Sequence, residues 1–167
     1  TPDFIRQAAI ASLQSGETFY SQNLGLPALR EAVAQAMAAK HPGAPGSAPI
    51  GAERIAITSG GVNALMLAVQ AVVDAGDEVV AVTPVWPNLT AQPLILGAHL
   101  RTVALRPQAG AWTLDLDVLL SAITVRTKLL VVNAPNNPTG WTLSREEQIA
   151  ILAHCRRTGT WILADEV

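Results

Sequence analysis

The stretch KLLVVNAPNNPTGWTLSREEQIAILAHCRRTGTWILADEV, residues 128–167, decides the fold. It begins with one apolar run of strand length, Lys128–Asn133, and ends with another, Thr160–Ala164. Between them, Ser144–Arg157 has the pattern of a helix, and its opening Ser-x-x-Glu is typical of a capping box. A strand, a helix and a second strand in this order predict two parallel strands joined by a crossover helix.

The same alternation extends toward the N-terminus, and it predicts an α/β fold with a mostly parallel sheet and helices on both faces. Residues 1–50 are expected to form an N-terminal helical segment and a loop, with a surface loop at His41–Pro49. Residues 51–167 are expected to form the α/β domain. The remaining strands are expected at Arg54–Thr58, Glu78–Thr83 and Leu100–Leu105, and the remaining helices at Leu26–Lys40, Val62–Asp74, Asn88–Leu96 and Asp115–Ile123.

Composition and charge argue against several classes of protein. Half of the residues are hydrophobic, 14% are charged, and the net charge is −2, which argues against a nucleic-acid partner. The apolar runs are far shorter than the roughly 20 residues of a membrane span, and no signal peptide is visible, so we expect a cytoplasmic protein. Cys155 is the only cysteine, which permits no internal disulfide. The three histidines lack the spacing of metal ligands, and no metal site is expected.

Two segments at the ends of expected strands could bind a ligand, because open parallel sheets bind ligands beyond the carboxyl ends of their strands. Thr58–Gly61 leads directly into a helix, where free backbone N–H groups can hold a phosphate. The same segment could also be a plain strand-to-helix turn, because two glycines before a helix are by themselves a weak signal for phosphate binding. Trp86 follows the next strand between two prolines. It could be a flat platform for a ring or an ordinary core residue.

The last two strands end in polar segments as well. The octet Asn133–Gly140 contains two prolines that stiffen it, so it could aim the amide of Asn137 at a ligand. The alternative is a turn rich in turn-forming residues. Asp165 ends the last strand, where an acid is costly to bury unpaired. It therefore needs a salt bridge, a helix cap or a ligand.

Taken in order, these segments resemble the class I and II aminotransferases of fold type I, which depend on pyridoxal 5′-phosphate (PLP). The resemblance covers nearly the whole chain, and the octet is its most specific part. It implies an incomplete large domain, amino acid and 2-oxo acid substrates, and a homodimer. The matching segments are Tyr20–Gly25 with Leu29-Arg30, Thr58–Gly61, Ala75–Val79, Thr83–Trp86, Asn133–Gly140 and Ala164–Val167.

The resemblance also implies a role for individual residues in a PLP site. PLP works as an electron sink, and a carboxylate beside its pyridine nitrogen would keep that nitrogen protonated. The implied cofactor contacts are Gly60, Gly61 and Val62 for the phosphate, Trp86 for the ring and the substrate, Asn137 for the phenolic oxygen and the substrate, Asp165 for the pyridine nitrogen, and Tyr20 for the phosphate of the neighbouring subunit.

The family's imine-forming lysine is expected beyond Val167, because neither Lys40 nor Lys128 lies in a suitable loop. We therefore expect no catalytic residue within these 167 residues and no transamination by this polypeptide alone. The chain begins at Thr1 and not at methionine, which leaves its natural start open. Three alternatives remain. They are another fold-type I PLP enzyme (a C–S lyase, a synthase or a decarboxylase), the PLP-binding effector domain of a transcription regulator, and an α/β binding domain without PLP.

Overall fold

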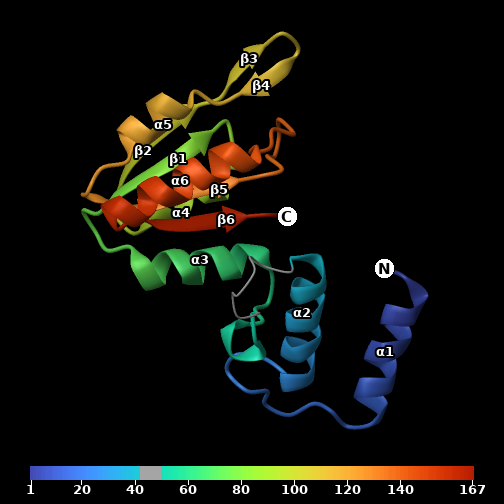
Figure 1. Ribbon diagram of the computed structural model, residues 1–167. Coiled ribbons are helices and arrows are strands. Elements are labelled where there is room, and N and C mark those ends of the chain that lie inside the picture. The colour runs from blue at the N-terminus through green and yellow to red at the C-terminus, as the bar shows by residue number, and fades with distance from the viewer. Residues whose placement is uncertain (42–49) are drawn as a thin grey trace. The chain divides into compact units, whose positions relative to one another are not determined.

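The first 58 residues form one of two units in the chain, and Ser59–Val167 form the other. The computed structural model describes residues 1–41 and 50–167 (Figure 1). Apart from His41, the expected surface loop at 41–49 lies outside the described residues. The domain boundary drawn from the sequence, between residues 50 and 51, stays a prediction.

The first unit contains the helices α1 (Asp3–Gln14) and α2 (Pro27–Lys40) and the short 3-10 helix η1 (Ala52–Arg54). The expected helix at 26–40 is confirmed, with Pro27 in its first turn as such a residue should be. Helix α1 was not predicted from the sequence, and none of its residues is buried.

The expected strand at 54–58 is wrong. The guanidinium of Arg30 donates to the main-chain oxygens of Ile55 at 2.8 Å and Ala52 at 2.6 Å. The N–H of Ile57 donates to the main-chain oxygen of Leu24 at 3.0 Å. The oxygen of Ile55 and the N–H of Ile57 thus have hydrogen-bond partners without a neighbouring strand. Such partners matter because a buried main-chain group without one costs free energy.

The second unit is built on a four-stranded sheet, and all of its neighbouring strands are parallel. In spatial order the strands are β2 (His99–Ala104), β1 (Glu78–Thr83), β5 (Thr127–Asn133) and β6 (Trp161–Asp165). A small antiparallel hairpin of β3 (Arg106–Gln108) and β4 (Ala111–Thr113) was not expected. The predicted parallel sheet is confirmed.

Four helices cover the sheet: α3 (Gly61–Val72), α4 (Asn88–Ile95), α5 (Leu116–Ala122) and α6 (Arg145–Thr158). All four lie where the sequence predicts helices, apart from small shifts at their ends. The capping box of α6 is present, because the hydroxyl of Ser144 accepts from the N–H of Glu147 at 3.1 Å and the carboxylate of Glu147 accepts from the N–H of Ser144 at 2.7 Å.

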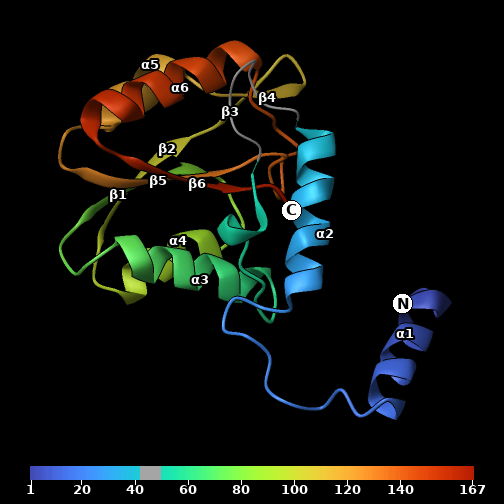
Figure 2. The same ribbon diagram turned by 60° about the horizontal axis from the view of Figure 1, so that its bottom comes forward.

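Two separate cores lie on the two faces of the sheet. Val79 and Ala81 of β1 pack in one core with residues of α3 and α4, and the intervening Val80 and Val82 pack in the other with residues of α5 and α6. This alternation follows from the two-residue period of a strand. Figure 2 shows α3 and α4 below the sheet and α5 and α6 above it, so the predicted helices on both faces are confirmed.

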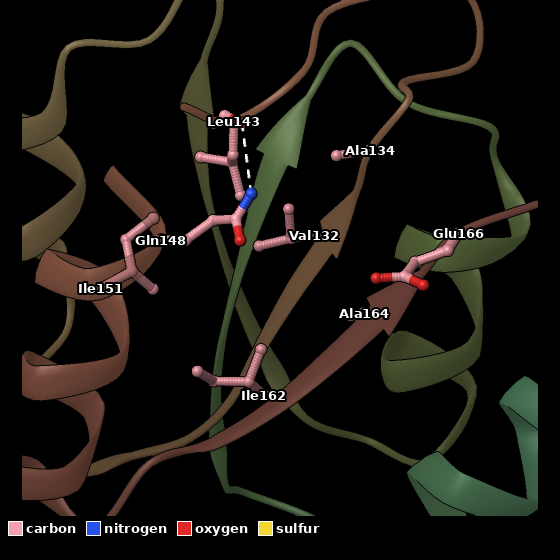
Figure 3. A pocket seen from close by; sticks show the side chains of 8 residues that line it. All are labelled: Val132, Ala134, Leu143, Gln148, Ile151, Ile162, Ala164 and Glu166. Carbon is pink, nitrogen blue, oxygen red and sulfur yellow. Dashed lines mark hydrogen bonds between the residues drawn. The ribbon is translucent and has the colours of Figure 1, made fainter. Parts of the chain in front are cut away.

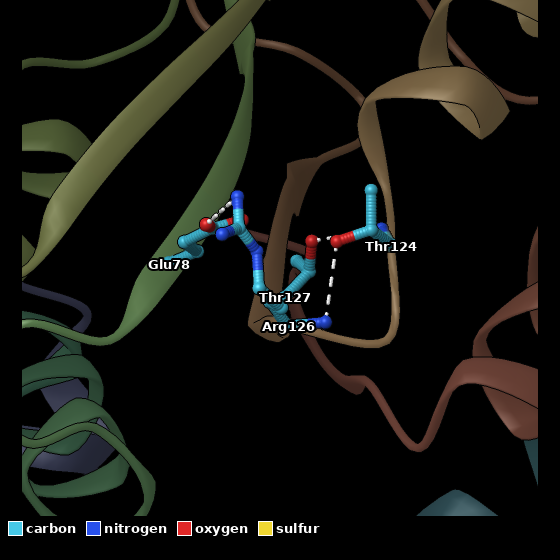
Figure 4. Close-up of polar contacts among 4 residues, drawn as sticks. All are labelled: Glu78, Thr124, Arg126 and Thr127. Carbon is cyan, nitrogen blue, oxygen red and sulfur yellow. Dashed lines mark hydrogen bonds and ion pairs between the residues drawn. The ribbon is translucent and has the colours of Figure 1, made fainter.

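Polar contacts lie at the amino ends of β1 and β5 (Figure 4). Arg126 forms an ion pair with Glu78 at 2.7 Å, and the hydroxyl of Thr127 accepts from the N–H of Thr124 at 2.9 Å. The carboxyl ends of β1, β5 and β6 lie at the opposite edge of the sheet, next to the polar segments that follow these strands in the sequence. No helix among residues 1–41 and 50–167 has the length and apolar character needed to span a bilayer.

Candidate functional site

A cavity of about 570 Å³ lies at the carboxyl ends of β5 and β6. Its volume falls in the range typical of small-molecule and cofactor sites. Five of the seven residues implied as cofactor contacts line it, and they come from α3, from the loops after β1 and β5, and from the end of β6: Gly61, Val62, Trp86, Asn137 and Asp165.

The N-terminus of α3 forms one wall of this cavity. Gly60 precedes the helix with φ 156° and ψ 165°, a conformation that residues with side chains rarely adopt. A Cβ atom added at Gly60 or Gly61 would meet nothing within 4 Å, so the space in front of this turn is open. The N–H groups in the first turn of a helix and the positive end of its dipole favour an anion at such a place. Gly60 itself lines an adjoining cavity that shares Gly61 and Val62 with the first.

Trp86 is half-buried and lies between the core and the cavity. It packs against the core between the sheet and the helices α3 and α4, and it also lines the cavity. The two interpretations of this residue, core and ring platform, are therefore compatible. Its main-chain oxygen accepts from the N–H of Leu89 at 3.1 Å, which ties the loop to the start of α4.

Asn137 lies in a loop that its own polar groups hold in place. Its N–H donates to Oδ1 of Asn133 at 2.6 Å. Within the same loop, Oδ1 of Asn136 accepts from the N–H of Thr139 at 3.1 Å and from its hydroxyl at 2.7 Å. Among the described residues the carboxamide of Asn137 has no hydrogen-bond partner, and the residue is exposed at the cavity. It is therefore available to a ligand.

Asp165 is 7% exposed and ends β6 at the cavity wall. Its Oδ1 accepts from the N–H of Val167 at 3.3 Å, and no described Lys, Arg or His forms an ion pair with it. A buried carboxylate without a cation is costly, so the arrangement suits a positively charged ligand atom. A protonated pyridine nitrogen is such an atom, and the open turn at Gly60 and Gly61 suits a phosphate. The described residues thus fit PLP.

Tyr20 and the two lysines are not among the residues that line this cavity. Tyr20 belongs to the first unit and is fully exposed, so its role stays a prediction. Lys128 is exposed near the amino end of β5, at the end of the strand opposite the cavity. The described residues contain no group of three or more His, Cys, Asp or Glu side chains that could hold a metal ion.

Sequence reasoning missed the roles of two buried polar residues. Asn133, at the end of β5, bonds to both the octet loop and β6. Gln92, in α4, donates from Nε2 to the main-chain oxygen of Val62 at 3.1 Å and so supports the first turn of α3. In both cases the available signal was a polar residue next to apolar ones. The partner of Gln92 lies 30 residues away in the sequence, and the partner of Asn133 on β6 depends on the register between the two strands.

A smaller cavity of about 190 Å³ lies on the other face of the sheet, between α6 and the ends of β5 and β6 (Figure 3). It is lined mainly by apolar side chains such as Val132, Ile151 and Ile162. Gln148 also lines it, and its Nε2 donates to the main-chain oxygen of Leu143 at 3.2 Å. None of the residues implied as cofactor contacts lines this cavity.

The whole chain, residues 1–167, matches the family model for aminotransferase class I and II, and the chain therefore belongs to this family. Members of the family are PLP-dependent enzymes. The chain is 34% identical over 166 residues to the probable aspartate/prephenate aminotransferase of Aquifex aeolicus, which covers 99% of the chain and 41% of the relative. It is 33% identical over 167 residues to the arginine–pyruvate transaminase of Pseudomonas aeruginosa, covering 100% of the chain and 41% of the relative.

Solved structures agree with this assignment. The N-succinyldiaminopimelate aminotransferase of Mycobacterium tuberculosis superposes with a TM-score of 0.91 at 31% identity. The match covers 99% of this chain and 42% of that chain. The fold is therefore that of the fold-type I aminotransferases, and the chain spans about two-fifths of the length of the relatives it matches.

Proposed function

We propose that this chain is the cofactor-binding part of a PLP-dependent aminotransferase, which moves an amino group between an amino acid and a 2-oxo acid. The observation that carries the proposal is the meeting of four chemically distinct groups at one cavity: the N-terminus of α3, the indole of Trp86, the free carboxamide of Asn137 and the carboxylate of Asp165. Each suits a different part of PLP, namely the phosphate, the ring face, the phenolic oxygen and the pyridine nitrogen.

PLP supplies an electron sink for a carbanion at the substrate α-carbon. The residues of this chain bind and orient it. The N–H groups at the start of α3 hold the phosphate, with Gly60, Gly61 and Val62 leaving room for close approach. Asp165 keeps a proton on the pyridine nitrogen, because an opposite charge at short range favours the cationic form. Asn137 donates to the phenolic oxygen, and Trp86 covers one face of the ring and borders the substrate.

The proposal includes a homodimer in which Tyr20 reaches the phosphate at the neighbouring subunit's site. Full exposure of this tyrosine supports such a role. A cytoplasmic location is also part of the proposal. The amino donor and the acceptor are not assigned to single compounds, because the relatives are named for aspartate and prephenate in one case and for arginine and pyruvate in the other.

The test uses the full-length protein, with PLP removed and then added back. Binding is followed by the visible absorption of the bound cofactor, and a panel of amino acids is screened for the matching 2-oxo acid. Formation of the 2-oxo acid with retention of the amino group on the cofactor is the expected result. Release of ammonia, sulfide or carbon dioxide would instead indicate a lyase or a decarboxylase, and absence of PLP binding would overturn the proposal. The 167-residue chain alone is expected to give no transamination.

A further inference from the structure

One buried side chain bonds to both of the elements that carry the amide and the acid of the cavity. Asn133 is 3% exposed at the end of β5. Its Oδ1 accepts from the N–H of Asn137 at 2.6 Å, and its Nδ2 donates to the main-chain oxygen of Asp165 at 3.0 Å. The same side chain therefore connects the octet loop to β6.

The chemistry of this position requires an amide. Asn133 and Asp165 are register partners in the parallel pair β5–β6, and the oxygen of Asp165 also accepts from the N–H of Ala134 at 3.1 Å. Asparagine offers a donor and an acceptor together, whereas aspartate offers only acceptors and an aliphatic residue offers neither. An apolar residue, as the rest of β5 would suggest, would leave the N–H of Asn137 without the only hydrogen bond that the described residues give it.

We propose that Asn133 is a positioning residue that fixes the Asn137 amide relative to the Asp165 carboxylate, so that both meet one cofactor ring. This inference rests on the proposed function. Asn133 holds the main chain of Asn137 directly, while the carboxamide of Asn137 has no other partner among the described residues. Loss of the Asn133 side chain therefore lets the Asn137 amide move away from the phenolic oxygen while β6 and its acid stay in the sheet.

The same strand pair offers a matched control at its other end. The hydroxyl of Thr160, just before β6, donates to the main-chain oxygen of Thr127 at 3.0 Å. Thr160 is buried like Asn133 and also bonds a side chain to the main chain of the adjacent strand. It lies at the amino ends of the strands, away from the cavity. Its loss removes a comparable bond without touching the loop of Asn137.

The experiment is a double-mutant cycle in the full-length protein, with PLP affinity measured by absorbance titration and the thermal midpoint measured without PLP. Asn133→Ala is expected to weaken PLP binding about tenfold, which is the effect of losing one buried hydrogen bond. Asn137→Ala is expected to weaken it similarly, and the double variant no more than about Asn137→Ala alone, because both act through one contact. Thr160→Ala is expected to lower the thermal midpoint with PLP affinity within about twofold of the wild type.

Two outcomes overturn the inference. One is a double variant in which the effects of Asn133→Ala and Asn137→Ala multiply. The other is an Asn133→Ala protein that loses thermal stability as Thr160→Ala does but binds PLP normally. If Asn133→Ala does not fold, Asn133→Leu, which has a similar size but lacks the acceptor for the N–H of Asn137, enters the same cycle under the same criteria. A wild-type protein that binds no PLP overturns the proposed function itself, and is thereby distinguished from a failure of this inference alone.

Discussion

Nε2 of Gln92 in α4 lies 3.1 Å from the main-chain oxygen of Val62, in the first turn of α3. Gln92 is 6% exposed, and its Oε1 is buried without a hydrogen-bond partner among the described residues. An unpartnered buried acceptor costs free energy, whereas the donor on the same side chain stabilises the turn that faces the cavity. The two halves of this amide therefore have opposite effects on stability.

This opposition predicts different results for two substitutions of Gln92. Gln92→Glu places a second acceptor against the oxygen of Val62 and should lower the free energy of unfolding by about 2 kcal/mol. Gln92→Met removes the donor and the unpartnered acceptor together and should change it by less than about 1 kcal/mol. Denaturant unfolding of the full-length protein measures both. Gln148→Glu is the control, because Gln148 makes a similar bond at 3.2 Å but is exposed. Equal effects of the two Gln92 variants would contradict this account.

The carboxylate of Asp165 should matter far more for activity than the neighbouring acid. Asp165→Asn keeps the shape of the side chain but removes the charge that would hold a proton on the pyridine nitrogen. We expect kcat/KM of the full-length enzyme to fall about hundredfold, or ~2.7 kcal/mol of transition-state stabilisation. Glu166→Gln, which alters an exposed acid one residue later, should stay within about threefold of the wild type. Comparable losses in both variants would show that kcat/KM depends on the total negative charge of the cavity and not on Asp165 in particular.

The capping box of α6 should contribute to stability without affecting the cofactor. Ser144→Ala removes the acceptor for the N–H of Glu147 and should cost about 1 kcal/mol in the free energy of unfolding. PLP affinity should not change, since α6 packs on the face of the sheet that lies away from the cavity. Ser121→Ala is the control and should cost less than about 0.5 kcal/mol, because Ser121 is exposed and its hydroxyl donates to the main-chain oxygen of Asp117 in the same helix. A change in PLP affinity on Ser144→Ala would show that the two faces are coupled.

Burial raises the pKa of the Cys155 thiol above its ordinary value. The folded state therefore favours the neutral thiol, and this contribution to stability is complete below the unfolded pKa of about 8.5. It is lost as the pH rises from there through the higher folded pKa. The free energy of unfolding should thus fall above about pH 8.5 by more in the wild type than in Cys155→Ala. Equal pH slopes in the two proteins would contradict the prediction, and rapid reaction of the native thiol with a thiol reagent at pH 8 would contradict the burial.

Local patterns in the sequence were sufficient for much of the fold. The apolar runs at Glu78–Thr83 and Lys128–Asn133 lie in largely buried strands, and the Ser144–Glu147 capping box starts a helix where the sequence predicts one. The strand expected at residues 54–58 fails because Arg30 supplies hydrogen bonds from 22 and 25 residues away, which no local pattern reveals.

The candidate site was predictable in part for the same reason. Glycines before a helix, an acid after an apolar strand and a proline-rich octet are local signals, and three residues that they indicate, Gly61, Asp165 and Asn137, line one cavity. The support that Asn133 gives depends on the register between β5 and β6, and the support from Gln92 depends on how α4 packs on α3. Those relationships exist only after folding, so reasoning along the chain could not supply them.

The alternation of Val79 and Ala81 with Val80 and Val82 has a consequence for how this protein can change over time. Substitutions among the residues packed beneath α5 and α6 alter a core that the ligand cavity does not share. The residues of that core can therefore change during evolution, or be redesigned for thermal stability, while the residues of the ligand cavity on the opposite face stay the same.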